Sequence, residues 1–117
     1  MTDSKYQAHR KSSELMIRAS IRLRDLSPED RPRERLLREG PRRLDQASLL
    51  SLMLGTGSHI NEDALMLAKR LIQVFGSVHK LSQASADALC EVRGVGPAKA
   101  ARLIASFELS RRIAGLQ

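Results

Sequence analysis

Aromatic side chains and cysteine are scarce in this sequence, and each shortage excludes a kind of protein. Phe, Tyr and Trp make up 3% of the 117 residues, so aliphatic side chains must build the core. A surface that stacks single-stranded bases on aromatic rings is therefore disfavoured. Cys90 is the only cysteine, which excludes an internal disulfide and fits a reducing compartment. Because it lies in the apolar run ALCEV, we expect it to be a small core side chain.

Long hydrophobic runs and catalytic constellations are also missing. No apolar run approaches the roughly 20 residues that span a membrane, and the stretch MTDSKYQAHRKSSELM is too polar for a signal peptide. We therefore expect a cytoplasmic protein. The sequence has no nucleotide-binding phosphate loop, no zinc-ligand spacing and no Ser/His/Asp or Cys/His set. We predict no catalytic residue, no bound metal and no cofactor.

What the sequence has in surplus is positive charge. Lys and Arg number 20 against 13 Asp and Glu, which gives a net charge of +7. Residues 1–45 hold 12 basic and 8 acidic side chains, and residues 46–117 hold 8 and 5, so the surplus is spread along the chain. Such a surplus suits a polyanion, of which nucleic acid is the commonest. A basic protein with no such partner fits the charge equally well.

The chain divides into an N-terminal arm and a helical domain. Residues 27–117 contain short helical patterns joined by short loops, which predicts an all-α fold, a compact bundle of about five to six short helices. Residues 1–26 form a basic arm, flexible or docked on a neighbour, through which copies of the chain could form a homo-oligomer. Part of the arm alternates apolar and polar side chains, which is typical of an extended segment. The apolar positions of that part are Ile17, Ala19, Ile21 and Leu23.

Capping residues set the expected helix boundaries. Ser, Asp and Asn accept hydrogen bonds from the first amides of a helix, Pro fits its first turn and Gly its end. Leu36 and Leu37 should face inward, whereas Lys69 and Arg70 should face outward. The expected starts are Ser27 or Asp30 with Pro32, then Asp45, Asn61, Ser77, Ser85 and Pro97, and the expected ends include Gly40, Gly76 and Arg112.

The stretch VRGVGPAKAARL, residues 92–103, carries the strongest functional signal. Two glycines around one valine allow a tight reversal, with the valine tucked between two helices that the alanines let approach closely. The first N–H groups of the second helix have no partner within it, so they can bind a phosphate. The predicted nucleic-acid-binding residues are Arg93, Gly94, Val95, Gly96, Ala98, Lys99 and Arg102.

Within this set, the roles differ. The N–H groups of Gly94, Gly96 and Ala98 with the ammonium of Lys99 would hold one phosphate, and the two arginines would attract its neighbours. A corner that only packs two helices also needs glycines. The full pattern from Leu89 to Leu103 resembles the helix-hairpin-helix motif, which grips the DNA backbone without reading sequence. That resemblance favours phosphate binding over packing alone.

A related glycine corner lies at residues 55–57, after an apolar helix in LLSLMLGTGSHINEDALMLAKRLI. Its connection is longer, and it lacks the proline and the lysine of the other corner. Two such corners, related by a pseudo-two-fold axis, can hold both strands of a duplex. The candidate contacts are Gly55, Thr56, Gly57 and His59, and a corner that only packs against its partner fits the pattern as well.

Three stretches, taken in order, resemble the N-terminal domain of the DNA repair protein RadC family, also called UPF0758. They are RPRERLLREGPRRLDQASLLSLMLGTG, ALMLAKRLIQVFGSV and LCEVRGVGPAKAARLIASFELSRR. The resemblance implies a SAM-like domain similar to the second domain of RuvA, with tandem helix-hairpin-helix motifs, one well formed and one degenerate. It also implies binding to duplex or branched DNA without sequence preference, accessory to repair or recombination in bacteria.

Full-length members of that family carry a further JAB/MPN-type metalloprotease-like domain with a zinc signature of Glu, H-x-H and Asp. This chain has no H-x-H, so we expect no enzymatic activity from it. A protein-interaction or oligomerisation module attached to such a domain is the alternative function. A DNA glycosylase-like fragment is the least favoured, because the only acid after Lys99 is Glu108, which should pair with Arg111 or Arg112 on the helix surface.

Overall fold

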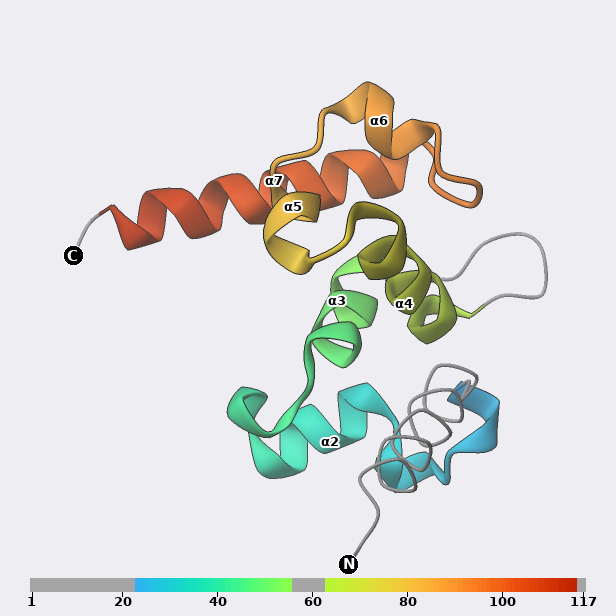
Figure 1. Ribbon diagram of the computed structural model, residues 1–117. Coiled ribbons are helices and arrows are strands. Elements are labelled where there is room, and N and C mark those ends of the chain that lie inside the picture. Colours follow the sequence, from blue (N-terminus) through green and yellow to red (C-terminus); the bar gives the residue numbers. More distant parts are fainter. Residues whose placement is uncertain (1–22, 56–62, 116–117) are drawn as a thin grey trace, which may run out of the picture.

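The computed structural model describes residues 23–55 and 63–115, and within these residues every regular element is a helix (Figure 1). The all-α prediction is confirmed. Most of the N-terminal arm, the predicted cap Asn61 and the candidate contacts Thr56, Gly57 and His59 lie outside the described residues. The elements are η1 (Leu23–Asp25), η2 (Pro28–Asp30), α2 (Pro32–Glu39), η3 (Pro41–Arg43), α3 (Gln46–Leu54), α4 (Ala64–Phe75), α5 (Val78–Ser82), α6 (Ala86–Cys90) and α7 (Pro97–Ala114).

The helix boundaries follow some of the capping signals. The predicted cap Ser27 or Asp30 of α2 is wrong, because Arg31 precedes Pro32 there and no side chain caps the helix. Asp45 precedes α3 as predicted, but its side chain accepts no cap hydrogen bond from the backbone.

The side chains of Ser77 and Ser85 accept hydrogen bonds from the N–H groups of Lys80 and Ala88 at 3.0 and 3.1 Å, as the sequence predicted. Helix α4 begins at Ala64, later than expected, because the carboxylate of Asp63 caps it. These caps satisfy amides that a helix leaves without internal partners.

Two helical hairpins form the centre of the molecule. We call α3 and α4 the first hairpin and α6 and α7 the second hairpin, and we call residues 55–57 and 94–96 the first and second corners. Helix α7 packs against α3, α5 and α6, whereas α2 contacts α3 at the other end of the molecule (Figure 1). The second hairpin therefore joins the core through the first helix of the first hairpin.

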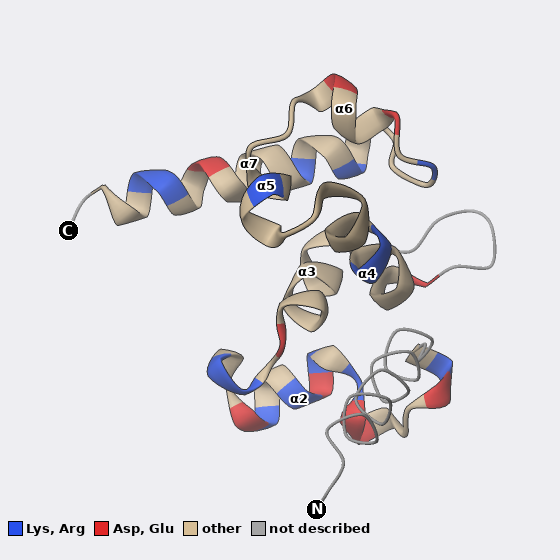
Figure 2. Cartoon of the chain, in the orientation of Figure 1, with Lys and Arg blue, Asp and Glu red and all other residues tan. Residues whose placement is uncertain are grey.

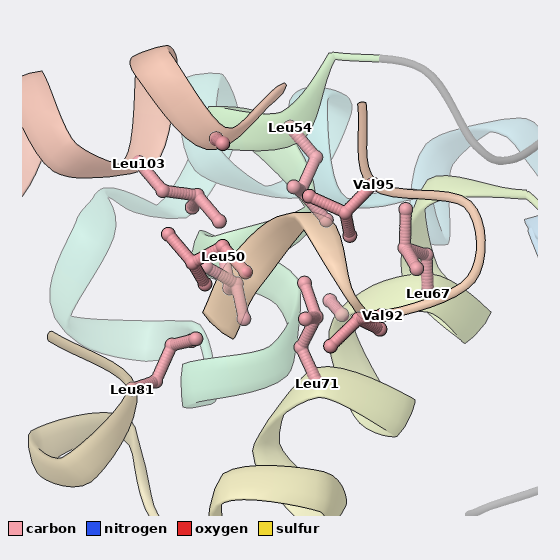
Figure 3. Packing of buried hydrophobic residues seen from close by; sticks show 11 residues of the cluster. Leu50, Leu54, Leu67, Leu71, Leu81, Val92, Val95 and Leu103 are labelled. Carbon is pink, nitrogen blue, oxygen red and sulfur yellow. The ribbon is translucent and has the colours of Figure 1, made fainter. Parts of the chain in front are cut away.

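Both hairpins share one aliphatic core. Leu54 and Leu67 of the first hairpin and Leu103 of the second are fully buried and belong to one cluster, in which Leu54 and Leu67 lie near Val95 and Leu103 lies near Leu50 (Figure 3). Burying a side chain of this size stabilises a fold by about 1.5–3 kcal/mol. The cluster comprises Leu50, Leu54, Leu67, Ala68, Leu71, Leu81, Leu89, Val92, Val95, Ala100 and Leu103.

Several positions depart from the sequence-based predictions. Cys90 is exposed, because its neighbour Leu89 points into the core and successive helical residues are about 100° apart. Leu37 is 80% exposed although it was expected to face inward, since among the described residues α2 contacts α3 and the short η2 and η3 segments, which leave this side of the helix uncovered. Residues Leu23–Asp25, the described end of the segment expected to be extended, form a 3-10 helix.

Candidate nucleic-acid interface

The second corner is a tight turn with its valine inside. The N–H of Val95 donates to the carbonyl of Val92 at 3.0 Å, and Gly94 adopts a φ of 92°, which side-chain-bearing residues rarely adopt. Val95 is 4% exposed and lies in the shared core, as the sequence predicted. Gly96 has an extended backbone and precedes Pro97, the first residue of α7. The turn therefore directs the start of an 18-residue helix towards solvent.

The start of α7 presents backbone donors without acceptors. The N–H of Ala100 donates to the carbonyl of Gly96 at 3.0 Å, which is the first bond of the helix. Among the described residues, no acceptor pairs with the N–H groups of Gly94, Gly96, Ala98 or Lys99. A Cβ built on Gly96 would meet nothing within 4 Å, so this backbone is open to approach. Open amides at the positive end of a helix dipole bind anions.

Two cations stand beside these amides. Within the described residues, neither the guanidinium of Arg93 nor the ammonium of Lys99 has a hydrogen-bond or ion-pair partner. Figure 2 shows basic residues at the tip of the turn and along the first turns of α7. The structure therefore brings Arg93, Gly94, Gly96, Ala98 and Lys99 together on one turn, with Val95 beneath them.

Arg102, the remaining predicted contact, has a partner within the protein. Its Nη1 donates to the carbonyl of Leu54 at 3.1 Å, at the end of α3. Arg70 of α4, which the sequence analysis placed on the outside, donates through Nη2 to the carbonyl of Arg93 in the second corner. A signal for Arg70 existed in the sequence: it lies on the second helix of its hairpin, as Arg102 does.

The first corner has a different chemistry. Gly55 ends α3 with a φ of 81°, and its N–H donates to the carbonyl of Ser51 at 3.2 Å. Beyond this corner, Asp63 Oδ1 accepts from the N–H of Met66 at 2.9 Å and Asp63 Oδ2 accepts from the N–H of Leu23 at 2.7 Å. A carboxylate of the protein therefore occupies the N-terminus of α4.

Charge also differs between the two described parts of the chain. Residues 23–55 hold seven basic and six acidic side chains, whereas residues 63–115 hold eight and four. Along α2 the two signs alternate (Figure 2), and Glu39 pairs with Arg35 at 3.1 Å and with Arg38 at 3.2 Å. Arg35, and then Arg38, hold the pKa of Glu39 below its usual range. Within α2 the positive charges are thus paired with glutamates, whereas the excess of basic over acidic side chains is larger in residues 63–115.

The last turns of α7 show the predicted surface pairs. Glu108 accepts from Arg112 at 3.0 Å and from Arg111 at 3.4 Å, and these guanidiniums lower the pKa of its carboxyl. On α4, partial burial lowers the pKa of Lys69, although the charges of Asp45 and Asp63 act in the opposite direction. The described residues contain no group of three or more His, Cys, Asp or Glu side chains placed to hold a metal ion. Nor does any helix among them have the length and apolar character needed to span a membrane.

Comparison with known proteins identifies the family. The model of the UPF0758 N-terminal family matches residues 23–101. A UPF0758 protein of Methanococcoides burtonii is 44% identical over 93 residues, which is 80% of this chain and 40% of the relative. A UPF0758 protein of Bacillus licheniformis is 43% identical over 96 residues, which is 82% of this chain and 42% of the relative.

A UPF0758 protein of Salinibacter ruber is 45% identical over 87 residues, 72% of this chain and 37% of the relative. The chain thus spans about two fifths of the length of these curated relatives. No solved structure matches the chain. The family model covers α2 to the first turns of α7 and includes both corners. The chain therefore belongs to the UPF0758 family, and its residues 23–101 correspond to the N-terminal domain of that family.

Proposed function

We propose that this domain binds the phosphate backbone of duplex DNA at the second corner, without reading base sequence. The observation that carries the proposal is the group of N–H donors of Gly94, Gly96, Ala98 and Lys99, which have no acceptor among residues 23–55 and 63–115, beside the charges of Arg93 and Lys99, which have no partner there. Contacts to phosphate fix the position of a protein on DNA but carry no sequence information. Such a site suits an accessory role in DNA repair or recombination, which is part of the proposal.

In this proposal the first corner does not bind phosphate. Because Asp63 already places a carboxylate at the N-terminus of α4, a phosphate there would meet a negative charge. We therefore assign phosphate binding to the second corner and packing to the first. One domain then has a single site for the DNA phosphate backbone, which implies weak binding whose affinity depends strongly on salt concentration.

The test is a titration of two duplexes of unrelated sequence, followed by fluorescence anisotropy over a series of salt concentrations. We expect equal affinities for the two sequences and a steep loss of affinity between about 50 and 200 mM salt. Lys99→Gln and Arg93→Gln should each lower the slope of log K against log salt by about 0.9. Undetectable binding of the wild type at low salt would contradict the proposal.

Arg42→Gln is the matched control for Arg93→Gln. Arg42 lies in η3, and its exposed side chain has no partner in the described residues. η3 contacts α2, at the end of the molecule away from α6 and α7 (Figure 1). Removing its charge should leave the salt slope unchanged. Equal losses in both arginine variants would show that net charge, and not the corner, binds DNA.

Gly96→Ala tests the backbone donors without changing charge. The φ of Gly96 is −96°, which alanine adopts readily, and the added methyl group meets no neighbour. The fold should therefore persist while the methyl group stands beside the open amides. We expect weaker DNA binding with unchanged thermal stability, and unchanged affinity would remove the backbone donors from the site.

An interaction module is the second candidate function, and exposed apolar residues on α7 favour it. Leu109 and Ile113 are 59% and 60% exposed, and they lie one turn apart on the same face of the helix. If this face mediates self-association, the sedimentation coefficient should rise with concentration in the wild type and not in Leu109→Ser. A concentration-independent monomer would leave DNA binding as the only candidate.

A further inference from the structure

The two corners are linked by arginines that act in both directions. Arg102, on the second helix of the second hairpin, donates to the carbonyl of Leu54. Arg70, on the second helix of the first hairpin, donates to the carbonyl of Arg93. Leu54 directly precedes Gly55, and Arg93 directly precedes Gly94, so each arginine reaches the carbonyl just before the first glycine of the other hairpin.

Both carbonyls lie directly before a glycine of positive φ, since Gly55 and Gly94 have φ angles of 81° and 92°. Leu54 is the last residue of α3, and the carbonyls at the end of a helix lack the N–H donors of a following turn. Arg93 lies in the turn between α6 and α7, where its carbonyl has no helical donor either. A guanidinium offers five donors in a rigid plane and can supply the missing bond from a neighbouring helix.

The bond from Arg70 has a direct consequence for the proposed phosphate site. The carbonyl of Arg93 and the N–H of Gly94 belong to one trans peptide plane and point in opposite directions. With the carbonyl held towards α4 by Arg70, the N–H of Gly94 faces away from α4. A cation on the carbonyl also polarises the peptide and makes its N–H a stronger donor.

We propose that Arg70 is a positioning residue for phosphate binding, which orients the peptide between Arg93 and Gly94 without touching the phosphate. Arg102 donates the corresponding hydrogen bond to the carbonyl at the end of α3, and this bond fixes the position of the two hairpins relative to one another. Arg93 and Lys99 carry the charge that meets the ligand. This inference rests on the proposed function. It assigns Arg93 and Lys99 to phosphate binding, and Arg70 and Arg102 to hydrogen bonds that orient the backbone.

The geometry at Gly55 supports the role of Arg102. A Cβ built on Gly55 would lie 2.6 Å from Nη1 of Arg102, closer than two such atoms can approach. Glycine at this position therefore allows the unusual backbone angle and also leaves room for the guanidinium. Gly55→Ala displaces Arg102 from the carbonyl of Leu54 and changes no charge.

The decisive experiment compares Arg70→Met with Lys99→Gln in the duplex titration. A positioning residue changes the affinity at every salt concentration, whereas a residue that binds phosphate also changes the salt slope. Arg70→Met should weaken binding by about threefold to tenfold, as the loss of one net hydrogen bond does, with an unchanged slope. A slope lowered by about 0.9 would make Arg70 a direct phosphate ligand and overturn the inference.

The second readout is the backbone amide resonance of Gly94 in the protein without DNA. It should shift in Arg70→Met, return part of the way in Arg70→Lys, and stay in place in Arg42→Gln. An unshifted Gly94 resonance in a folded Arg70→Met variant overturns the inference. If the wild type fails to bind DNA, the proposed function fails, whereas the resonance still decides whether Arg70 orients the peptide.

The role of Arg102 is tested by a double-mutant cycle with Gly55→Ala. In the wild-type background this substitution should lower the melting temperature through both backbone strain and the displaced guanidinium. In an Arg102→Met background only the strain remains, so the decrease should be smaller. Equal decreases in the two backgrounds would show that Arg102 does not hold the first corner.

Discussion

The glycines Gly55 and Gly94 share a positive φ, but the helices that follow the two corners begin differently. Each corner follows a short helix, each has a glycine with positive φ, and each receives an arginine from the other hairpin. At the N-terminus of α4 the carboxylate of Asp63 accepts a backbone hydrogen bond, whereas at α7 the cap is Gly96, which has no side chain to offer. The reciprocal arginine contacts are thus common to Gly55 and Gly94, and the capping residue decides whether the start of the helix remains open to an external anion.

The largest expected effect comes from breaking the core that the corners share. Leu54→Ala should lower the free energy of unfolding by about 2–5 kcal/mol, because it removes a fully buried side chain. Since the hairpins pack as one unit, amide hydrogen exchange should lose protection in both hairpins together. Loss of protection in α3 and α4 alone would show that the corners fold separately.

A smaller effect should separate the two glycines of the second corner. Gly94→Ala forces a side chain into a positive φ and should cost about 1–2 kcal/mol. Gly96→Ala should change stability by less than about 0.5 kcal/mol, because its backbone is extended and its surroundings are open. Urea denaturation measures the free energy of unfolding of both variants. Equal decreases in this free energy would mean that the turn geometry differs from that described.

Removing the carboxylate at α4 sharpens the comparison between the helix ends. Asp63→Ala should cost about 0.5–2 kcal/mol through the lost cap, whereas Asp63→Asn should keep most of it. If DNA lies near both corners, Asp63→Asn should also raise duplex affinity at low salt, because one negative charge is gone. Unchanged affinity in Asp63→Asn would confine the ligand to the second corner.

The smallest effect is expected at the far end of α7. Arg112, and then Arg111, lower the pKa of Glu108 from its ordinary 4.5, so this pairing stabilises the fold above that value. The contribution is lost as the pH falls through the lowered pKa. Glu108→Gln should therefore flatten the acid limb of a stability profile slightly and leave DNA affinity unchanged. A rise in affinity from the two released arginines would contradict a site confined to the corner.

Local signals in the sequence predicted much of this structure, and long-range contacts account for what they missed. Ser77, Ser85 and Pro97 mark helix starts because their effects extend over one turn only. Cys90 and Leu37 were placed inside, because an apolar neighbourhood does not reveal which helix face has a partner. Whether the described turn holds a phosphate stays a prediction.

The partners of the two arginines illustrate the same limit at the candidate site. Arg102 and Leu54 are 48 residues apart, and Arg70 and Arg93 are 23 apart. Charge alone could not distinguish an arginine that bonds a neighbouring carbonyl from one that awaits a ligand. Only the arrangement of the two hairpins in space makes that distinction visible.

The exchange of arginines also bears on how such a domain can be divided or inherited. A single hairpin cut out of this chain would carry a bare carbonyl before its glycine and half of an aliphatic core. Such a hairpin could pair the carbonyl and cover its half of the core only by packing against a second copy of itself. The smallest transferable unit is therefore the pair, and a swap of one hairpin between relatives must bring the matching arginine with it.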